Sequence, residues 1–403
     1  MIIIPILILF AIILAKLKKG IFAAFLVLVA TKSIVDAFWN IRMGPLSFGS
    51  IGGLLIPILF YPTLLNRKNF PKSWRLNATF LFLALSLSFI LALPVKLSAT
   101  LELLILNLNI YMGFFLIPSL ITNKKRLKQL LLAIIICGLF PIAVSLFQFQ
   151  TGIIFYARET VGLTRYVGFY HDAFPVRFYG LMTLLAILMY FQFFKPQRFL
   201  KYFLYGVTFS ALFSVYLVFS KAGVGITGLW IALIMFFSKS KVKQTIAIAV
   251  ALIVVSVMFG DVIYGNIEQL FSKETGYQAG EIKDARYTLA GRGYVWQEYW
   301  DFWTNEQPLF FQIFGDGLTR PTHNEFLRLL LISGVVGVVI FVFFIIRMFN
   351  SVFKANREYK LFGLMLLTMF IVDCTGLMPG NYYFYNILVW GLIGLTTLNK
   401  SLE

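Results

Sequence analysis

The sequence predicts an all-α, polytopic integral membrane protein. Hydrophobic residues make up 60% of the 403 residues, and charged residues make up only 13%. Apolar runs close to the length that spans a bilayer recur between short stretches rich in lysine and arginine, as expected of successive membrane-crossing helices. We therefore expect about 12 to 14 transmembrane helices, organised as a single transmembrane domain over residues 1–403.

Thirteen apolar runs follow one another along the chain, and the first and last of them are short. The predicted spans begin near Met1, Gly20, Gly49, Leu76, Ala99, Leu130, Gly180, Tyr202, Ala222, Gln244, Phe326, Leu361 and Phe384. The first run, MIIIPILILF, lacks the basic region and the small-residue cleavage site of a signal peptide. We expect it to be a retained span.

The basic residues predict the orientation of these spans. When the spans alternate, most cations fall in connections on one side, and the short connections on the other side contain only Arg42, Lys96 and Lys221. Loops rich in lysine and arginine stay in the cytoplasm, so the two long polar segments, residues 150–179 and residues 261–325, are expected outside. This partition explains the net charge of +18 as a topology signal, and we expect no nucleic-acid partner.

Ionisable residues inside predicted spans are costly and often functional. Those in this chain are Lys32, Asp36, Glu102, Arg328 and Asp373. Most of them fall toward the external ends of their helices, which indicates a hydrated cavity that opens outward. For Lys32 and Asp36 the alternative is mutual neutralisation, because residues four apart share one face of a helix.

The first external segment, residues 150–179, combines basic residues with aromatic residues and glycine. It contains the stretch RETVGLTRYVGFYHDAFPVRFYG, in which the candidate binding residues are Arg165, His171 and Arg177. Guanidinium groups form paired hydrogen bonds with phosphate oxygens and can stack on flat ring systems. This composition favours an anionic or glycan ligand. The alternative is an interfacial belt, in which tyrosine and arginine anchor the segment at headgroup depth.

The second external segment, residues 261–325, is expected to be partly helical. Arg292 follows Gly291 and begins a stretch whose tryptophans fall on roughly one helix face: Trp296, Trp300 and Trp303. Tryptophans at this spacing are typical of a helix that lies on the membrane surface. Further along, residues 314–317 predict a tight turn that leads to Arg320 and His323.

His323 begins the most distinctive pattern of the chain: His-Asn, nine residues, Gly334, two residues, Gly337. If one helix runs unbroken from His323, Gly334 lies about 16 Å along its axis on the same face. Glycines there would let a neighbouring helix approach closely. The alternative is a histidine that caps a span at the interface, above a pair of packing glycines.

This pattern resembles the signature of the O-antigen ligase and O-antigen polymerase superfamily. Arg165, followed by Val167, Gly168 and Phe169, is similar to the arginine-glycine element of that family's first external segment. Arg292, preceded by glycine and followed by the tryptophan-rich helix, is similar to the second element. The order of these elements and the membrane layout cover most of the chain, and the early spans match in character.

The resemblance implies a membrane glycosyltransferase of the GT-C class in the bacterial inner membrane, with its active site facing the periplasm or exterior. On this basis Arg165 and Arg292 bind the pyrophosphate of an undecaprenyl-pyrophosphate-linked oligosaccharide, and His323 is the general base. Further candidate substrate contacts are His171, Arg177, Arg286, Arg320 and Asn324. Arginines stabilise developing negative charge and a near-neutral imidazole can accept a hydroxyl proton. No metal and no other cofactor is expected. The implied partners are the lipid-linked oligosaccharide, membrane lipids and a chain-length regulator protein.

Within the superfamily, a polymerase passes a growing glycan to the next lipid-linked repeat unit, and a ligase passes the finished glycan to lipid A core. The segment from Lys32 to Trp39 and the stretch HDAFPVRFYG favour the polymerase, and the ligase is the alternative. A transporter or lipid-linked oligosaccharide flippase is a further alternative, because such proteins also hold charges inside their spans. Their charges lie near the midplane on interrupted helices.

Overall fold

The computed structural model describes residues 14–43, 65–237 and 260–398, together with residues 12, 46, 47, 53, 56, 60 and 61. The chain divides into two compact units. Unit 1 comprises Met1–Tyr61, Leu120–Gly223 and Ser401–Glu403, and unit 2 comprises Pro62–Ser119 and Val224–Lys400.

The described residues are mainly helical, which confirms the predicted structural class. The strands among them form two short antiparallel hairpins, both in unit 1. These are β1 (Arg42–Met43) with β2 (Leu46–Ser47), and β3 (Glu159–Thr160) with β4 (Leu163–Thr164).

Seven helices in the described part of the chain are long and apolar enough to cross a membrane. They are α4 with α5 (Lys72–Ser86, Phe89–Ala92), α6 (Leu97–Leu120), α7 (Lys124–Thr151), α8 (Phe174–Phe193), α9 (Arg198–Leu217), α15 (Glu325–Phe353) and α16 (Arg357–Gly376). Shorter apolar helices are α2 (Ile21–Ala37), α10 (Lys221–Phe237) and α17 (Tyr383–Thr397). These helices are consistent with a multi-pass membrane protein.

The ten helices coincide with ten of the thirteen predicted spans. The spans predicted near Met1, Gly49 and Gln244 fall largely outside the described residues. A total of 12 to 14 spans therefore stays a prediction.

In unit 1, α7 is the central helix, because it packs against α2, α8 and α9. The Asn123 side chain caps its first turn by accepting a hydrogen bond from the Arg126 amide at 2.9 Å, and Gly152 ends the helix with φ of 70°. A side chain at Gly138 would overlap the Thr183 hydroxyl of α8. The glycine therefore allows the close approach of these two helices.

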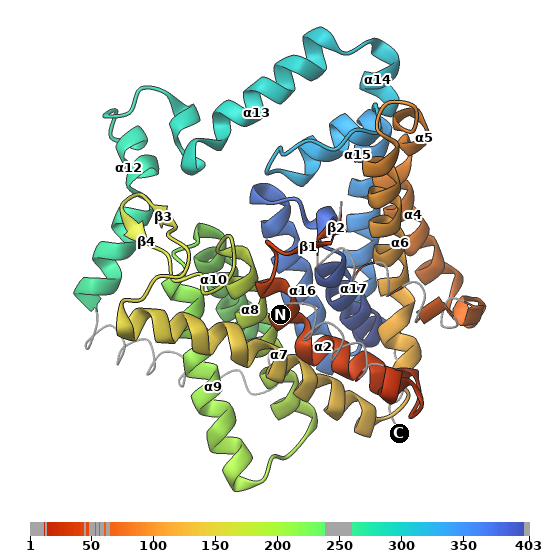
Figure 1. Ribbon diagram of the computed structural model, residues 1–403, viewed down its shortest axis with the longest axis vertical. Helices are drawn as coiled ribbons and strands as arrows, with labels where there is room; N and C mark the ends of the chain where they lie inside the picture. The colour runs from red at the N-terminus through yellow and green to blue at the C-terminus, as the bar shows by residue number, and fades with distance from the viewer. Residues whose placement is uncertain are drawn as a thin grey trace. The chain divides into compact units, whose positions relative to one another are not determined.

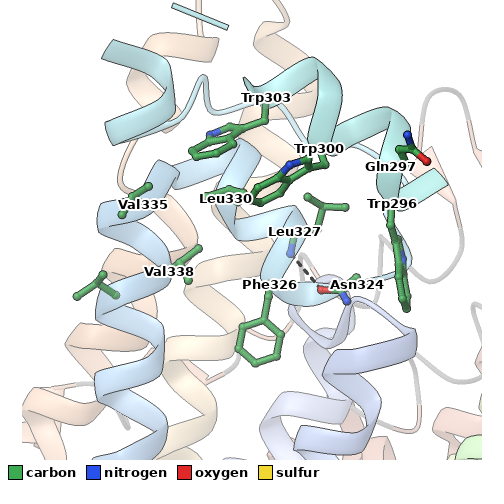
Figure 2. A pocket seen from close by; sticks show the side chains of 11 residues that line it. Trp296, Gln297, Trp300, Trp303, Asn324, Phe326, Leu327, Leu330, Val335 and Val338 are labelled. Carbon is green, nitrogen blue, oxygen red and sulfur yellow. Dashed lines mark hydrogen bonds between the residues drawn. The ribbon is translucent and has the colours of Figure 1, made fainter. Parts of the chain in front are cut away.

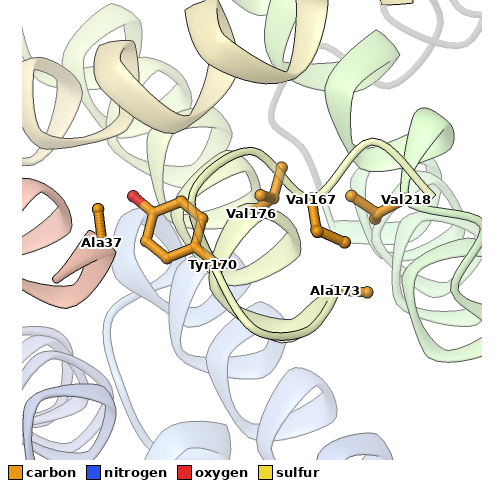
Figure 3. Packing of buried hydrophobic residues seen from close by; sticks show 6 residues of the cluster. All are labelled: Ala37, Val167, Tyr170, Ala173, Val176 and Val218. Carbon is orange, nitrogen blue, oxygen red and sulfur yellow. The ribbon is translucent and has the colours of Figure 1, made fainter. Parts of the chain in front are cut away.

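A buried apolar cluster fixes the second half of the first external segment within unit 1 (Figure 3). It consists of Ala37, Val167, Tyr170, Ala173, Val176 and Val218. The Tyr170 hydroxyl also donates a hydrogen bond of 2.8 Å to the Ser33 carbonyl of α2. This segment is thus anchored to α2 by both apolar packing and a buried hydrogen bond.

For Lys32 and Asp36 the structure shows the alternative expected from their spacing, mutual neutralisation. The two side chains form an ion pair on α2, and Asp36 is 27% exposed. The Tyr179 hydroxyl of α8 donates a second hydrogen bond to Asp36 at 2.5 Å. The pair therefore links α2 to the start of α8, near the C-terminal end of the first external segment.

In unit 2, α15 packs against α4, α14 (Leu309–Phe314) and α16, and α16 packs against α17. Trp390 of α17 lies at the centre of an aromatic core that includes Phe114, Phe344 and Phe370. Its indole nitrogen donates to Asn386 Oδ1 at 2.8 Å, so the largest buried ring also satisfies its polar atom.

The second external segment is partly helical, as the sequence predicts. After the helical residues 260–270 come α12 (Ser272–Gln278), η2 (Ala285–Tyr287), η3 (Leu289–Gly291), α13 (Arg292–Asp301), η4 (Phe302–Glu306) and α14. Figure 1 shows α13 leading toward α14, from which the chain returns to α15. The location of this segment outside the membrane stays a prediction.

The unbroken helix predicted from His323 through Gly334 is wrong. Helix α15 begins at Glu325, after the capping residue Asn324, and it is broken at Gly334, where φ is 65° and ψ is −169°. The break leaves backbone carbonyls without helical partners. The amides of Asp316 and Gly317 donate to two of them, Leu331 and Ile332, at 3.0 Å each. At the predicted tight turn, α14 ends at Phe314 and the chain bends at Gly317. The amides of this segment complete the broken helix.

Close approach at the two glycines of the pattern is confirmed. A side chain at Gly334 would overlap the backbone of Ile313 and Phe314 in α14. At Gly337 a β-carbon would lie 3.3 Å from the Ala84 carbonyl of α4. The glycines thus serve packing, but they do so around a bend rather than along one straight face.

Candidate functional site

The predicted site residues are divided between the two units. Arg165, His171 and Arg177 belong to unit 1. Arg286, Arg292, Arg320, His323 and Asn324 belong to unit 2. Because Arg165 belongs to one unit, and Arg292 and His323 belong to the other, the expectation that the three residues surround one chamber stays a prediction.

His323 is an exposed residue between the buried Thr322 and the half-buried Asn324. Its φ of 50° places it in the left-handed region, which is uncommon for residues other than glycine. Thr322 before it is 0% exposed, and its hydroxyl donates to the Asn324 carbonyl at 2.8 Å. Asn324 after it caps α15 by accepting from the Leu327 amide at 3.1 Å. Local backbone contacts thus fix the position from which the imidazole projects.

The start of α13 lies close to this loop. The Trp296 indole nitrogen donates a hydrogen bond of 3.0 Å to the Thr322 carbonyl, directly before His323. Arg292 lies four residues before Trp296 on α13, and residues four apart share one face of a helix. The first turn of α13 and the His323 loop are therefore neighbours in unit 2.

Arg292 begins α13, as the sequence predicts, after the left-handed residues Ala290 and Gly291. Its side chain reaches the last residue of α16. A β-carbon at Gly376 would lie 2.7 Å from Arg292 Nη1. The absence of a side chain at Gly376 therefore gives the guanidinium group the space that it occupies.

A pocket of about 730 Å³ opens where the two parts of α15 meet at the break (Figure 2). Its walls are formed by Trp296, Gln297, Trp300, Trp303, Asn324, Phe326, Leu327, Leu330, Val335, Val338 and Val339. The predicted tryptophan face of α13 and η4 is confirmed, and it forms one wall of this pocket. Polar side chains occur only at the end that carries Gln297 and Asn324, next to His323. The pocket is suited to an apolar ligand whose polar end lies at that rim.

The sequence singled out Arg328 but missed its partners. Arg328 forms a buried ion pair with Glu325, and these residues are 0% and 1% exposed. The Gly380 amide donates to Glu325 Oε2 at 3.2 Å. The spacing Glu-x-x-Arg on a helix could have indicated the pair. Nothing local indicates Gly380, because 55 residues separate it from Glu325.

Arg320 is engaged within the turn that precedes His323. Its guanidinium group donates to Asp316 at 2.6 Å, and its side chain is 19% exposed. It also lies over the Phe302 ring, 4.8 Å from the centroid. These contacts support the turn, so the structure favours a supporting role for Arg320 over direct contact with a substrate.

Arg286 pairs with Asp284 on the surface of unit 2. Its guanidinium group donates to Asp284 Oδ2 at 2.7 Å and to Gln297 Oε1 at 3.1 Å. The hydrogen bonds from Arg286 hold the pKa of Asp284 well below its usual value. Gln297 also lines the tryptophan pocket, so Arg286 supports one edge of that pocket.

In unit 1, Arg165 and Arg177 both reach the turn between α9 and α10. Arg165 Nη2 donates to the Phe219 carbonyl at 3.2 Å, and Arg177 Nη1 donates to Ser220 Oγ at 3.2 Å. Arg177 is 3% exposed. The structure therefore brings these two predicted residues to one turn, where Arg177 is buried.

His171 lies in a different setting from His323. Its ring is 5.2 Å from the Trp39 ring, and its Nε2 is 3.1 Å from Asp172 Oδ2. Its side chain is 48% exposed. The carbonyl of His171 accepts a hydrogen bond from Arg158 Nε at 2.6 Å.

No protein-family model matches this chain, and no curated protein sequence matches it significantly.

The surroundings of His323 provide three chemical functions. An exposed imidazole can accept a proton at neutral pH. The nearby Arg292 carries a permanent positive charge. The tryptophan pocket offers an apolar surface that includes Trp296 of α13 and Asn324, the residue after His323. This combination fits a reaction on a molecule with a nucleophilic hydroxyl, an anionic leaving group and a hydrocarbon part.

Proposed function

We propose that this protein is a membrane glycosyltransferase that polymerises undecaprenyl-pyrophosphate-linked oligosaccharide units into O-antigen or a related surface polysaccharide. The observation that carries the proposal is the position of His323. It is exposed in a fixed loop beside the start of α13, and the next residue, Asn324, lines the tryptophan pocket.

In the proposed reaction, an acceptor hydroxyl attacks the anomeric carbon of the lipid-linked glycan. A new glycosidic bond forms while the bond from the sugar to pyrophosphate breaks, and the electron pair leaves with the pyrophosphate. His323 takes the hydroxyl proton. Arg292 neutralises the charge that develops on the leaving group.

The tryptophan pocket supports a lipid-linked substrate. One of its walls belongs to α15, a candidate membrane span. Val335 and Val339 of that wall are 42% and 60% exposed, so the pocket is continuous with a helix face suited to lipid. A hydrocarbon chain could lie there while its pyrophosphate stays near Arg292.

The test is a reaction of the purified protein with a synthetic undecaprenyl-pyrophosphate-linked repeat unit, with and without lipid A core. A ladder of products from the donor alone is expected. A single adduct that depends on core would instead identify a ligase, to which the same surroundings of His323 apply. No transfer under either condition, together with movement of the donor across a bilayer, would overturn the proposal in favour of a flippase.

A further inference from the structure

A buried ion pair lies two residues beyond His323. Glu325 and Arg328 are both in the first turn of α15, and their side chains are almost completely buried. Arg328 Nε donates to Glu325 Oε2 at 3.1 Å, and Arg328 Nη2 contacts the other carboxylate oxygen. The pair is bidentate, which fixes the relative orientation of the two groups.

The chain between α16 and α17 closes over this pair. The Gly380 amide donates to Glu325, and a side chain at Gly380 would overlap both Arg328 and Glu325. The neighbouring Pro379 carbonyl accepts from Asn386 Nδ2 at 2.7 Å. The ion pair is thereby connected to α17, whose Asn386 is itself bonded to Trp390 in the aromatic core.

A second anchor lies on the other side of His323. Thr322 is completely buried, and it is bonded to Asn324 through its hydroxyl and to Trp296 through its carbonyl. Among residues 322–325, only His323 is exposed and has a left-handed backbone conformation. A strained backbone of this kind persists only where the surrounding contacts over-determine it.

We propose that Glu325, Arg328 and Gly380 are positioning residues that hold His323 in its left-handed conformation, next to Asn324 of the tryptophan pocket. The stability of the fold does not account for such a pair, because a buried ion pair is often replaced by apolar residues without loss. A positioning role does account for the pair, because the pair is connected to α17 and lies two residues after His323. The catalytic consequence rests on the proposed function, but the conformation of His323 can be measured without any activity.

The chain offers a direct probe, because it has only two histidines. With His171→Gln, histidine-labelled protein gives a single imidazole signal in NMR spectra, from His323. A narrow signal is expected for this parent protein. We expect the signal to broaden or split when Glu325→Gln and Arg328→Gln are introduced together. The double variant removes both charges, so no uncompensated charge is left buried.

The matched control is the ion pair of α2, replaced by Lys32→Gln with Asp36→Asn. It should leave the His323 signal unchanged. Gly380→Ala disturbs the contact of Gly380 with Glu325 and Arg328 without altering a charge. It should broaden the signal as the double variant does. Folding of each variant is checked by its melting temperature. A narrow, unshifted signal in either folded variant, or equal broadening in the control, would overturn the proposal.

Activity provides the second readout. If His323 is the general base, the double variant should lose at least ten-fold in kcat while KM for the donor stays the same, because positioning affects the reaction and not binding. Failure of the proposed function would appear as no transfer by the parent protein, with the NMR result intact. Failure of this inference would appear as normal kcat with an unchanged NMR signal.

Discussion

The two histidines of the chain occupy opposite kinds of surroundings. His171 in unit 1 is held by its own side chain, which contacts Trp39 and Asp172 near the surface. His323 in unit 2 is held through its backbone, by a buried threonine before it and a buried ion pair after it. Side-chain contacts therefore position the His171 ring, whereas backbone contacts of the flanking residues position His323. This difference in anchoring is the basis on which we take His323 as the candidate base.

The largest effect is expected when one member of the buried ion pair beside His323 is neutralised. Glu325→Gln leaves the Arg328 charge uncompensated in the interior, which should cost about 3–5 kcal/mol of unfolding free energy. Asp36→Asn, in the ion pair of α2 in unit 1, should cost less because Asp36 is 27% exposed. Denaturation of the two variants in detergent measures the difference. Equal losses would remove the contrast between the two ion pairs.

A smaller effect on activity alone is expected from Gly376→Ala. The added methyl group would displace Arg292 Nη1, which lies 2.7 Å from the position of the new β-carbon. The end of an arginine side chain moves easily, so the melting temperature should not change. A displaced guanidinium group should lower kcat about 10- to 100-fold.

Gly206→Ala is the matched control for this change, because a β-carbon at Gly206 meets nothing within 4 Å. It should preserve both kcat and the melting temperature. Full activity of Gly376→Ala would show that the position of Arg292 at the end of α16 is unimportant for transfer.

A tryptophan of the pocket and the tryptophan beside His171 should differ in their effect on substrate binding. Trp300→Ala removes part of the pocket wall and should raise KM for the lipid-linked donor about five- to ten-fold, through lost apolar contact area. Trp39→Ala, beside His171, should leave this KM unchanged. Initial rates over a range of donor concentrations test both variants. A larger increase with Trp39→Ala would place the lipid elsewhere.

The smallest effect is expected at the exposed pair of Asp284 and Arg286, as a reference for the buried pair. Because hydrogen bonds from Arg286 lower the pKa of Asp284 in the folded protein, the interaction stabilises the fold above the usual carboxylate value of 3.8. This contribution fades as the pH falls through the lowered pKa. Melting temperatures of wild type and Asp284→Asn should therefore differ slightly at pH 7 and converge in strong acid. Added salt should reduce the difference. A difference that grows toward low pH would contradict the assignment.

Local patterns predicted much of the fold near His323. The start of α13 at Arg292, the tryptophan face and the turn at residues 314–317 all depend on residues close together in the chain. The same holds for the pair Lys32 and Asp36, one helical turn apart.

The parts that sequence could not predict depend on distant residues. The break at Gly334 is stabilised by α14 and by the turn before Arg320, which supply the hydrogen bonds that the bent helix lacks. Helical spacing alone favours an unbroken helix there, since isolated glycines are tolerated within helices. The hydrogen bond from the Gly380 amide to Glu325 likewise forms only when α16 and α17 pack against α15.

The most direct test of the account compares His323→Ala with His171→Ala in vesicles in which glycan elongation and donor flipping are measured together. The account predicts that His323→Ala stops elongation while flipping continues, and that His171→Ala retains most of its elongation. Elongation at the wild-type rate by His323→Ala would contradict the assignment of His323 as the general base.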